Sequence, residues 1–201
     1  KTLEARDKKL IKYLIKHKHT STLEHNMVTF RFKVPLFIRS QHHRHRTWAY
    51  NEISRRYTEE NLQFYEPTSF RIQSKSNRQA SLVTEQIDPV MGFDHACKPY
   101  RASSAMTKHH QDSVKLYNHL MISGVCREQA RGVLPQNLYT EYIGSVNLNN
   151  LLKFIELRTH DGAQWEIQQV AKACGKIACQ LWPTVMEAYQ DVRGIDFGLS
   201  E

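Results

Sequence analysis

The amino-acid sequence predicts a single α/β domain of the α+β type over residues 1–201, with a central twisted sheet and flanking helices. Several long segments carry apolar residues at the spacing of an α-helix, whereas a shorter one alternates apolar and polar residues as a half-buried strand does. The chain has 201 residues, of which 40% are hydrophobic, so one sizeable core can form. The sequence shows neither an internal repeat nor a clear domain boundary.

The elements predicted for the first half of the chain follow from these helical and strand periodicities. Residues 7–18 predict a helix, because leucine and isoleucine recur at i, i+1, i+4 and i+5 while lysines occupy the opposite side. Residues 28–34 alternate and predict a strand with one buried face. Pro35 ends this strand and can open a short helix, since its fixed φ suits the first helical turn. Residues 60–102 have no sustained period, so we expect loop with scattered strand.

The second half of the chain is predicted to be mainly helical. Its elements are, in order, a helix over 104–123, a short helix over 127–134, an extended segment over 138–146, a helix that begins at Asn147, and a long helix from Ala163 to Pro183. Gly124 is suited to ending the first of these helices, and Asn147 to capping the third. The apolar residues that lie in step along the last helix are Val170, Cys174, Ile177 and Leu181.

Composition and cysteine usage exclude several classes of protein. No apolar run approaches the roughly 18 residues of a membrane span, and the first residues lack the hydrophobic core of a signal peptide. The four cysteines include no CxxC pair, which predicts reduced thiols in a cytoplasmic protein, or in the host cytoplasm if the source is viral. Because the chain opens with Lys1 rather than Met, we expect the natural chain to have a further N-terminal segment.

The highest density of basic residues lies at 44–57, which contain four arginines, two aliphatic hydroxyls and one carboxylate. The whole chain has a formal net charge of +8, from 28 Lys and Arg against 20 Asp and Glu. Guanidinium groups bind phosphate bidentately, and hydroxyls complete such sites. By composition alone the stretch is consistent with a solvated basic face or, given its Trp and Tyr residues, with a nucleic-acid-binding patch.

The order of the residues is more specific than their composition. Arg-His-Arg at 44–46, followed by seven residues and then by Ser54 and Arg-Arg-Tyr, resembles the signature of the flavin-dependent thymidylate synthases. Residues 7–25, which end in the histidine-rich segment 17–25, resemble that family's first helix and histidine loop. Further blocks at 123–140, 146–147, 157–158 and 163–169 are similar to the family in the same order. The resemblance covers most of the chain apart from roughly residues 62–112.

This resemblance implies an activity, a cofactor and an assembly. Enzymes of this family reductively methylate dUMP to dTMP, with 5,10-methylenetetrahydrofolate as the carbon donor, NADPH as the reductant and FAD as the cofactor. It also implies a homotetramer with active sites at subunit interfaces, and neither a nucleic-acid nor a membrane partner. Residues whose positions imply FAD binding are Ser21, Arg44, His45, Arg46, Thr47, Glu52, Asn147, Asn149 and Lys153. Those that imply dUMP binding are Gln41, His42, His43, Arg44, Glu52, Ile53, Ser54, Arg55, Arg56, Arg131 and Arg158, while His19 and Tyr57 are implied to lie near the flavin and the folate.

Arg158 is the residue that the resemblance implies to be catalytic. A fixed cation beside the pyrimidine would favour ionisation at N3 and direct electron density towards C5. This role would replace the addition of a nucleophilic cysteine, and no cysteine in the sequence stands out as a nucleophile. Ser54 has no obvious base partner in its block, so we expect it to hydrogen-bond phosphate rather than to attack a substrate.

Some positions depart from the commoner family pattern, among them Ala49 and Gly162. Asn149 stands where the family often has Arg, and Lys153 could supply the missing cation one turn further along the same helix. These departures leave a catalytically altered relative open as an alternative, beside a basic nucleic-acid-binding module. We expect no metal site, because arginines interleave the histidines of the 42–46 segment.

Overall fold

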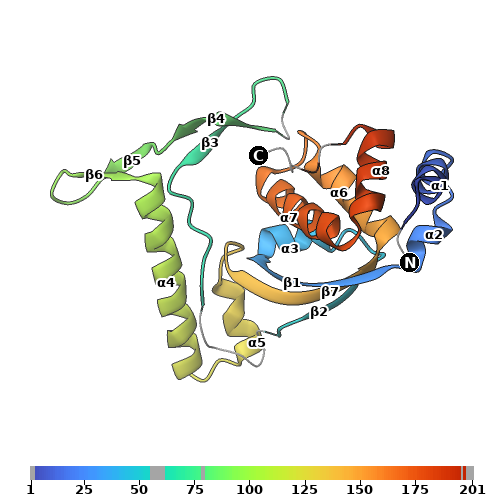
Figure 1. Cartoon of the computed structure of the whole chain (residues 1–201). Helices are drawn as coiled ribbons and strands as arrows, with labels where there is room; N and C mark the ends of the chain where they lie inside the picture. Colours follow the sequence, from blue (N-terminus) through green and yellow to red (C-terminus); the bar gives the residue numbers. More distant parts are fainter. Residues whose placement is uncertain (1–2, 55–61, 78–79, 196, 198–201) are drawn as a thin grey trace. The chain divides into compact units, whose positions relative to one another are not determined.

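A computed structural model of the chain describes residues 3–54, 62–77, 80–195 and 197 (Figure 1). The first half contains, in order, α1 (Ala5–Lys16), α2 (Ser21–Glu24), β1 (Met27–Pro35), α3 (Leu36–His42), β2 (Ala49–Glu52), β3 (Phe70–Gln73), β4 (Ser81–Ile87), β5 (Val90–Phe93) and β6 (Pro99–Arg101). The second half contains α4 (Ala102–Ile122), α5 (Arg127–Ala130), the 3₁₀ helix η1 (Arg131–Val133), β7 (Tyr139–Asn147), α6 (Leu148–Thr159), α7 (Trp165–Leu181) and α8 (Pro183–Arg193). The mixed α/β class is therefore confirmed.

In the described part of the chain, the strands form three small sheets. The largest has the order β1-β7-β2, so β7 is its central strand. The other two are the antiparallel pairs β3–β4 and β5–β6, which occupy the segment where the sequence predicts only scattered strand. The alternation of the N-terminal strand is confirmed, because Phe30, Phe32 and Val34 are buried while the residues between them are exposed.

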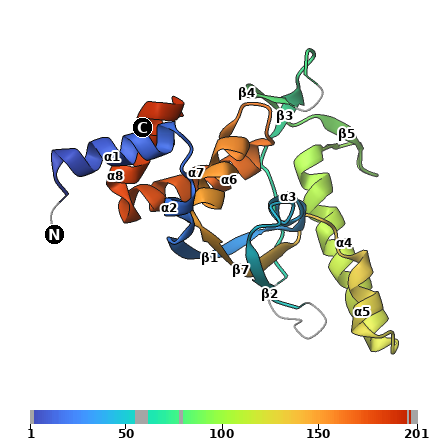
Figure 2. The ribbon, with the colours of Figure 1, turned by 90° about the vertical axis from the view of Figure 1, so that its right-hand side faces the viewer.

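The chain divides into two compact units. Unit 1 comprises Lys1–Phe30, His45–Ala49 and Ser145–Glu201, and unit 2 comprises Arg31–Arg44 and Tyr50–Gly144. Within unit 1, α6 packs against α7, α1 against α8, and α2 against α6 (Figures 1 and 2). Within unit 2, α4 follows the β5–β6 hairpin directly and contacts both of its strands as well as α5. The single domain and the homotetramer stay predictions.

The core of unit 1 is built on α6. Leu151, Leu152, Phe154 and Ile155 are all buried, as the apolar pattern of this helix predicts. The predicted cap is also confirmed, because the Asn147 side chain accepts a hydrogen bond of 2.9 Å from the backbone N–H of Asn150. This cap fixes the start of the helix that carries Asn149, Lys153 and Arg158.

The apolar face predicted for α7 is only partly correct. Cys174 is buried, but Ile177 and Leu181 are 42% and 52% exposed. The side of α7 that packs against the rest of unit 1 is instead lined by Ile167, Ala171, Cys174, Gly175 and Ala178, which are mostly small residues. A Cβ atom on Gly175 would lie 3.4 Å from the side chain of Phe197, which is already van der Waals contact, so a side chain longer than that of alanine would have to displace Phe197.

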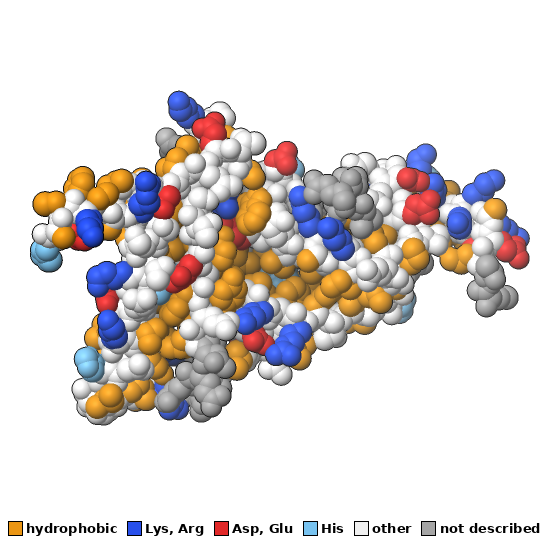
Figure 3. All heavy atoms as spheres, turned by 60° about the vertical axis from the view of Figure 1, so that its left-hand side comes forward, with side chains coloured by type: hydrophobic (Ala, Val, Ile, Leu, Met, Phe, Trp, Pro, Cys, Tyr) orange, Lys and Arg blue, Asp and Glu red, His pale blue; other side chains and the backbone are white. Residues whose placement is uncertain are grey.

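Apolar side chains also remain at the surface of unit 2. Val83 and Ile87 of β4, and Val90, Met91 and Phe93 of β5, are between 44% and 68% exposed. Hydrophobic side chains can be seen among the charged ones on the face drawn in Figure 3. Among the described residues, these apolar side chains of the two hairpins are therefore left without a covering layer.

Candidate active site

Unit 2 contains a pocket of about 550 Å³, referred to below as the Glu52 pocket. Its lining residues come from the start of α3, the end of β2, α5 with η1, and the segment that leads into β7. They are Leu36, Arg39, Glu52, Ile53, Ser54, Glu128, Arg131, Gly132, Leu134, Gln136, Leu138 and Thr140. The structure thus brings together four residues that the family resemblance implies to bind dUMP: Glu52, Ile53, Ser54 and Arg131.

The carboxylate of Glu52 is held by two donors. Arg39 Nε donates to Glu52 Oε1 at 3.1 Å, and the hydroxyl of Thr140 donates to the same oxygen at 2.7 Å. The backbone N–H of Ile53 donates to the carbonyl of Glu141 at 3.0 Å, so the chain remains tied to β7 as it leaves β2. These contacts fix the position of the residues that lead to Ser54.

Arg131 supplies a cation to the same pocket. Its Nε donates to the carbonyl of Glu128 at 3.3 Å, which orients the guanidinium group. Among the described residues, its two terminal nitrogens have no hydrogen-bond partner. A guanidinium group and a hydroxyl are the donors that recognise phosphate, so Arg131 and Ser54 give the pocket the chemistry of an anion site.

Gln41 and His42 at the end of α3, and His43 directly after it, lie in different surroundings. His42 is fully buried: its Nδ1 is 2.7 Å from the hydroxyl of Tyr142, and its ring meets the edge of Phe32. His43 packs against Tyr50 with ring centroids 4.0 Å apart, and burial, assisted by the charge of Arg39, lowers the pKa of His43. Neither histidine lines the Glu52 pocket, and nor does the half-buried Gln41.

In unit 1, Arg158 is paired with His45. Arg158 lies in the last turn of α6, and its Nε donates to His45 Nε2 at 3.0 Å. Burial, and then the charge of Arg158, lower the pKa of His45 to about 4. His45 is therefore neutral at neutral pH, with the lone pair on Nε2 and the proton on Nδ1. The rings of His45 and Phe154 also meet edge to face, with centroids 4.9 Å apart, and this contact helps to fix the position of the acceptor Nε2.

Unit 1 also contains a smaller pocket of about 240 Å³, referred to below as the Lys153 pocket. Its lining residues are Leu14, Ile15, Lys18, His19, Thr20, Leu23, Asn149, Lys153, Glu156, Tyr189 and Arg193. This brings together His19, Asn149 and Lys153, three of the residues implied to lie at the flavin.

Some charged groups of the Lys153 pocket neutralise one another, and the charge that remains is positive. Glu156 accepts from the hydroxyl of Tyr189 at 3.0 Å and from Arg193 at 2.9 Å, so these groups neutralise one another. The amide of Asn149 donates to Glu24 at 3.0 Å. By contrast, the ammonium groups of Lys18 and Lys153 have no carboxylate partner among the described residues. This donor set fits an anionic ligand such as a diphosphate.

The remaining predicted residues fall outside these pockets. Arg44, Arg46 and Thr47 are exposed in the turn between α3 and β2, and Ser21 is the exposed first residue of α2. The side chain of Asn147 caps α6. Arg55, Arg56 and Tyr57 lie outside the described residues. The Glu52 pocket belongs to unit 2, whereas the Arg158–His45 pair and the Lys153 pocket belong to unit 1.

Several lining residues were not expected from the sequence. Arg39 and Thr140 hold Glu52, yet both stand in segments whose apolar patterns indicate only a helix start and a strand. Lys18 also lines a pocket, and the only feature of the sequence that points to it is its position between two histidines of the histidine loop.

Two further observations concern the described part of the chain alone. None of its helices combines the length and apolar character that a membrane crossing requires. Within residues 3–54, 62–77, 80–195 and 197, no group of three or more His, Cys, Asp or Glu side chains is placed to hold a metal ion.

Similarity to known proteins identifies the family. Residues 1–184 match the family described as "Thymidylate synthase complementing protein". The chain is 40% identical over 185 residues to a flavin-dependent thymidylate synthase of Thermus thermophilus, which covers 92% of this chain and 64% of the relative. It is 37% identical over 184 residues to that of Thermosipho melanesiensis, covering 92% of this chain and 76% of the relative. The chain therefore belongs to the flavin-dependent thymidylate synthase family, and it spans less than two thirds of the length of the Thermus thermophilus relative.

A solved structure supports the same family. The fold superposes on a crystal structure of a UMP/dUMP methylase, PolB from Streptomyces cacaoi bound with 5-bromo-UMP, with a TM-score of 0.78. The two are 29% identical, and the match covers 96% of this chain and 85% of that one.

Proposed function

We propose that the chain catalyses the FAD-dependent reductive methylation of dUMP to dTMP. The balanced reaction takes dUMP, methylenetetrahydrofolate, NADPH and a proton to dTMP, tetrahydrofolate and NADP⁺. The observation that carries this proposal is the Glu52 pocket, in which Ser54 and Arg131 meet although they stand far apart in the sequence. Membership of the family makes a pyrimidine nucleotide the ligand that this pocket is expected to take.

The Glu52 pocket has the size and the donors that dUMP requires. Its volume lies within the range of about 300–1,000 Å³ that is usual for small-molecule sites. The Arg131 guanidinium and the Ser54 hydroxyl would bind the phosphate, and the fixed carboxylate of Glu52 would accept hydrogen bonds from the sugar or base. Arg39 and Thr140 hold that carboxylate, so they are positioning residues of the proposed site.

Arg158 is the proposed catalytic cation. The guanidinium would stabilise negative charge on the pyrimidine as N3 ionises, which raises the electron density at C5. The neutral His45 fixes the direction of the guanidinium group by accepting from its Nε. His45 is thus proposed as the residue that positions Arg158.

The cysteines agree with chemistry that needs no thiolate nucleophile. Cys97 and Cys126 are exposed and line neither pocket, while Cys174 is buried and Cys179 half-buried. Burial raises the pKa of Cys174 to about 12 and also raises the pKa of Cys179. A thiol whose pKa lies so far above neutrality contains almost no thiolate, which is the nucleophilic form.

The residues of the Lys153 pocket fit the cofactor that the family name implies. Lys18 and Lys153 would bind the diphosphate of FAD, while Asn149 and His19 would complete the pocket wall. When bound, FAD supplies the hydride-carrying group that NADPH reduces. Lys153 would then provide the cation that Asn149 lacks.

A homotetramer with shared active sites is proposed for the same enzyme. The exposed apolar side chains of β4, β5 and α7 support it, because surfaces of this kind are usually covered by another protein surface. In such an assembly, each Glu52 pocket would meet an Arg158 and a Lys153 pocket from one chain or another.

Purified protein tests the proposal directly. After reconstitution with FAD and removal of the excess, it should be yellow and should form dTMP only when dUMP, methylenetetrahydrofolate and NADPH are all present. Arg131→Ala should weaken dUMP binding by about 10- to 100-fold, the loss expected for a charge-assisted phosphate contact. The matched control is Arg31→Ala, which removes an exposed arginine of the same unit that does not line the pocket. Equal affinities in both variants would remove dUMP from the Glu52 pocket.

A further inference from the structure

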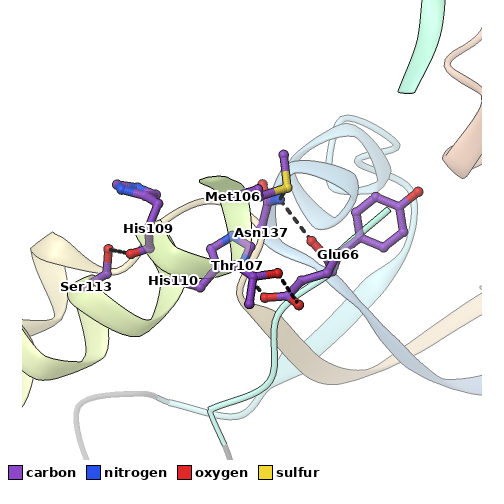
Figure 4. A network of polar contacts seen from close by, with 8 residues as sticks. Glu66, Met106, Thr107, His109, His110, Ser113 and Asn137 are labelled. Carbon is purple, nitrogen blue, oxygen red and sulfur yellow. Dashed lines mark hydrogen bonds and ion pairs between the residues drawn. The ribbon is translucent and has the colours of Figure 1, made fainter. Parts of the chain in front are cut away.

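A buried histidine and a carboxylate join α4 to the segment 62–66, which is referred to below as the strap (Figure 4). Nδ1 of His110 lies 2.7 Å from Oε1 of Glu66, and the hydroxyl of Thr107 donates to Oε2 of Glu66 at 3.0 Å. Both partners come from successive turns of α4, so one carboxylate is bound through both of its oxygens. None of these three residues belongs to the motifs that the resemblance explains.

The surroundings make this contact stronger than an ordinary surface pair. The side chain of His110 is only 3% exposed, and its ring is stacked on Phe64 of the strap, with centroids 4.6 Å apart and planes 10° apart. The hydrogen bond from His110, more than that from Thr107, holds the pKa of Glu66 below its usual range. Glu66 is therefore ionised at neutral pH, and the hydrogen bonds to it are charge-assisted.

The strap in turn holds one wall of the Glu52 pocket. The backbone N–H of Tyr65 donates to the carbonyl of Asn137 at 2.9 Å, and that of Tyr139 donates to the carbonyl of Gln63 at 2.8 Å. Phe64 forms a β-bridge with Leu138, which lines the pocket. Next to Tyr139, Thr140 also lines the pocket and donates to Glu52.

A second tie runs through the side chain of Asn137. Its amide donates to the carbonyl of Tyr65 at 3.0 Å and lies 3.5 Å from the sulfur of Met106 on α4 (Figure 4). The chain of contacts from α4 through the strap to the pocket wall is therefore continuous and lies entirely within unit 2.

We infer that Glu66, His110 and Thr107 form a clamp that positions the 136–140 wall of the Glu52 pocket for nucleotide binding. These are positioning residues, since none of them lines the pocket itself. The inference rests on the proposed function, because it assigns the clamp to the affinity for dUMP. A clamp of this kind acts on the binding of the nucleotide and leaves the FAD residues of unit 1 untouched.

Two substitutions of His110 separate its hydrogen bond from its ring. His110→Phe keeps a ring against Phe64 but removes the donor to Glu66. His110→Asn removes the ring but retains an amide N–H near the position of Nδ1, so it should restore the bond. Glu66→Gln changes the other partner, whose side chain is 40% exposed. It removes the negative charge and keeps the shape of the side chain. The matched control is His109→Asn. The neighbouring His109 is exposed, the hydroxyl of Ser113 donates only to its backbone carbonyl, and its ring meets that of His110 only loosely, with centroids 6.3 Å apart.

The measurements are the KM for dUMP, kcat and FAD content of each full-length variant. We expect His110→Phe and Glu66→Gln to raise the KM by about tenfold, the factor that corresponds to about 1.4 kcal/mol, with kcat changed by less than about twofold. His110→Asn should recover most of the affinity, and His109→Asn should match the wild-type chain. An unchanged KM in His110→Phe and Glu66→Gln, or a loss of kcat alone, would overturn the inference.

Amide hydrogen exchange supplies a readout that does not depend on turnover. The N–H groups of Tyr65 and Tyr139 should exchange faster in His110→Phe than in His109→Asn, whereas those of α6 in unit 1 should not change. Unaltered exchange at both tyrosines would overturn the clamp. A wild-type chain that binds no dUMP would instead overturn the proposed function, and the exchange experiment would still decide whether the clamp exists.

Discussion

The pairing of His45 with Arg158 leads to a sharp prediction about the chemistry. His45→Leu removes the acceptor that lies 3.0 Å from Arg158 Nε, while the apolar contact with Phe154 can be kept. A hydrogen bond to a charged group contributes about 1.5–3 kcal/mol. If that energy holds the guanidinium in its productive direction, the step that Arg158 promotes should slow by about 10- to 150-fold.

The assay follows the two half-reactions separately by stopped flow without oxygen. The first is the reduction of FAD-loaded protein by NADPH, and the second is the reoxidation of the flavin when dUMP and methylenetetrahydrofolate are added. The loss should be confined to the second, because only that half-reaction needs charge on the pyrimidine. His45→Gln is the matched control, since its side-chain oxygen can accept from Arg158 near the position of Nε2.

The same pair predicts a dependence on pH. The folded-state pKa of His45 is about 4, below the ordinary value of 6.5, so the unfolded chain binds this proton more readily. The contribution of His45 to stability is therefore fully present above about pH 6.5 and is lost as the pH falls towards 4. The second half-reaction depends on the folded protein alone, so it should decline only as the pH approaches 4, where folded His45 takes up its proton. In His45→Gln this component should be absent. Equal losses in the Leu and Gln variants, or a decline in the Gln variant over the same pH range, would refute the role of His45.

Three other predictions test separate parts of the structure. Asn147→Ala should lower the free energy of unfolding by about 1 kcal/mol in urea titrations, because the backbone N–H of Asn150 loses its cap. Lys153→Ala should retain less FAD after gel filtration, as read from flavin absorbance per chain, while binding dUMP as the wild type does; undiminished flavin would exclude Lys153 from the cofactor site. Gly194→Ala should destabilise the end of α8 by about 1 kcal/mol in a thermal melt, because Gly194 has a φ of 66° that a side chain disfavours.

Much of the fold could be predicted because its signals are local. The alternation in β1 and the Asn147 cap each depend on a few neighbouring residues. Gly124 has a φ of 85°, the left-handed conformation expected of a glycine that ends a helix. In these places the local pattern and the packing favour the same structure.

The errors arise where packing against a distant segment decides the structure. β2 is a four-residue strand, Ala-Tyr-Asn-Glu, and its pairing with β7 outweighs a weak strand propensity. No helix was predicted after Pro183, yet this proline occupies the first turn of α8, where its missing N–H has no cost. In α7 the buried side carries mostly small residues, which a pattern of large apolar side chains does not identify, so Ile177 and Leu181 remain exposed.

The candidate site divides in a similar way. The resemblance implies that Glu52, Ile53, Ser54 and Arg131 all bind dUMP. The four line one pocket, and their binding of dUMP stays a prediction. The sequence does not indicate that His42 is buried against Tyr142. A histidine among polar residues has the pattern of a ligand-binding residue, and only the folded structure shows that its neighbour is Tyr142. Arg39 could not be found from its segment, since only the folded structure brings it to Glu52.

The origin of the hydride that completes the methyl group tests the proposed function most directly. FAD-loaded protein is incubated without oxygen with dUMP, methylenetetrahydrofolate and NADPH, and the nucleotide and folate products are separated and quantified. The proposal predicts one dTMP and one tetrahydrofolate for each NADPH consumed, with neither product formed when FAD is removed. The formation of dihydrofolate in place of tetrahydrofolate, or the absence of dTMP from protein that retains FAD and binds dUMP, would contradict it.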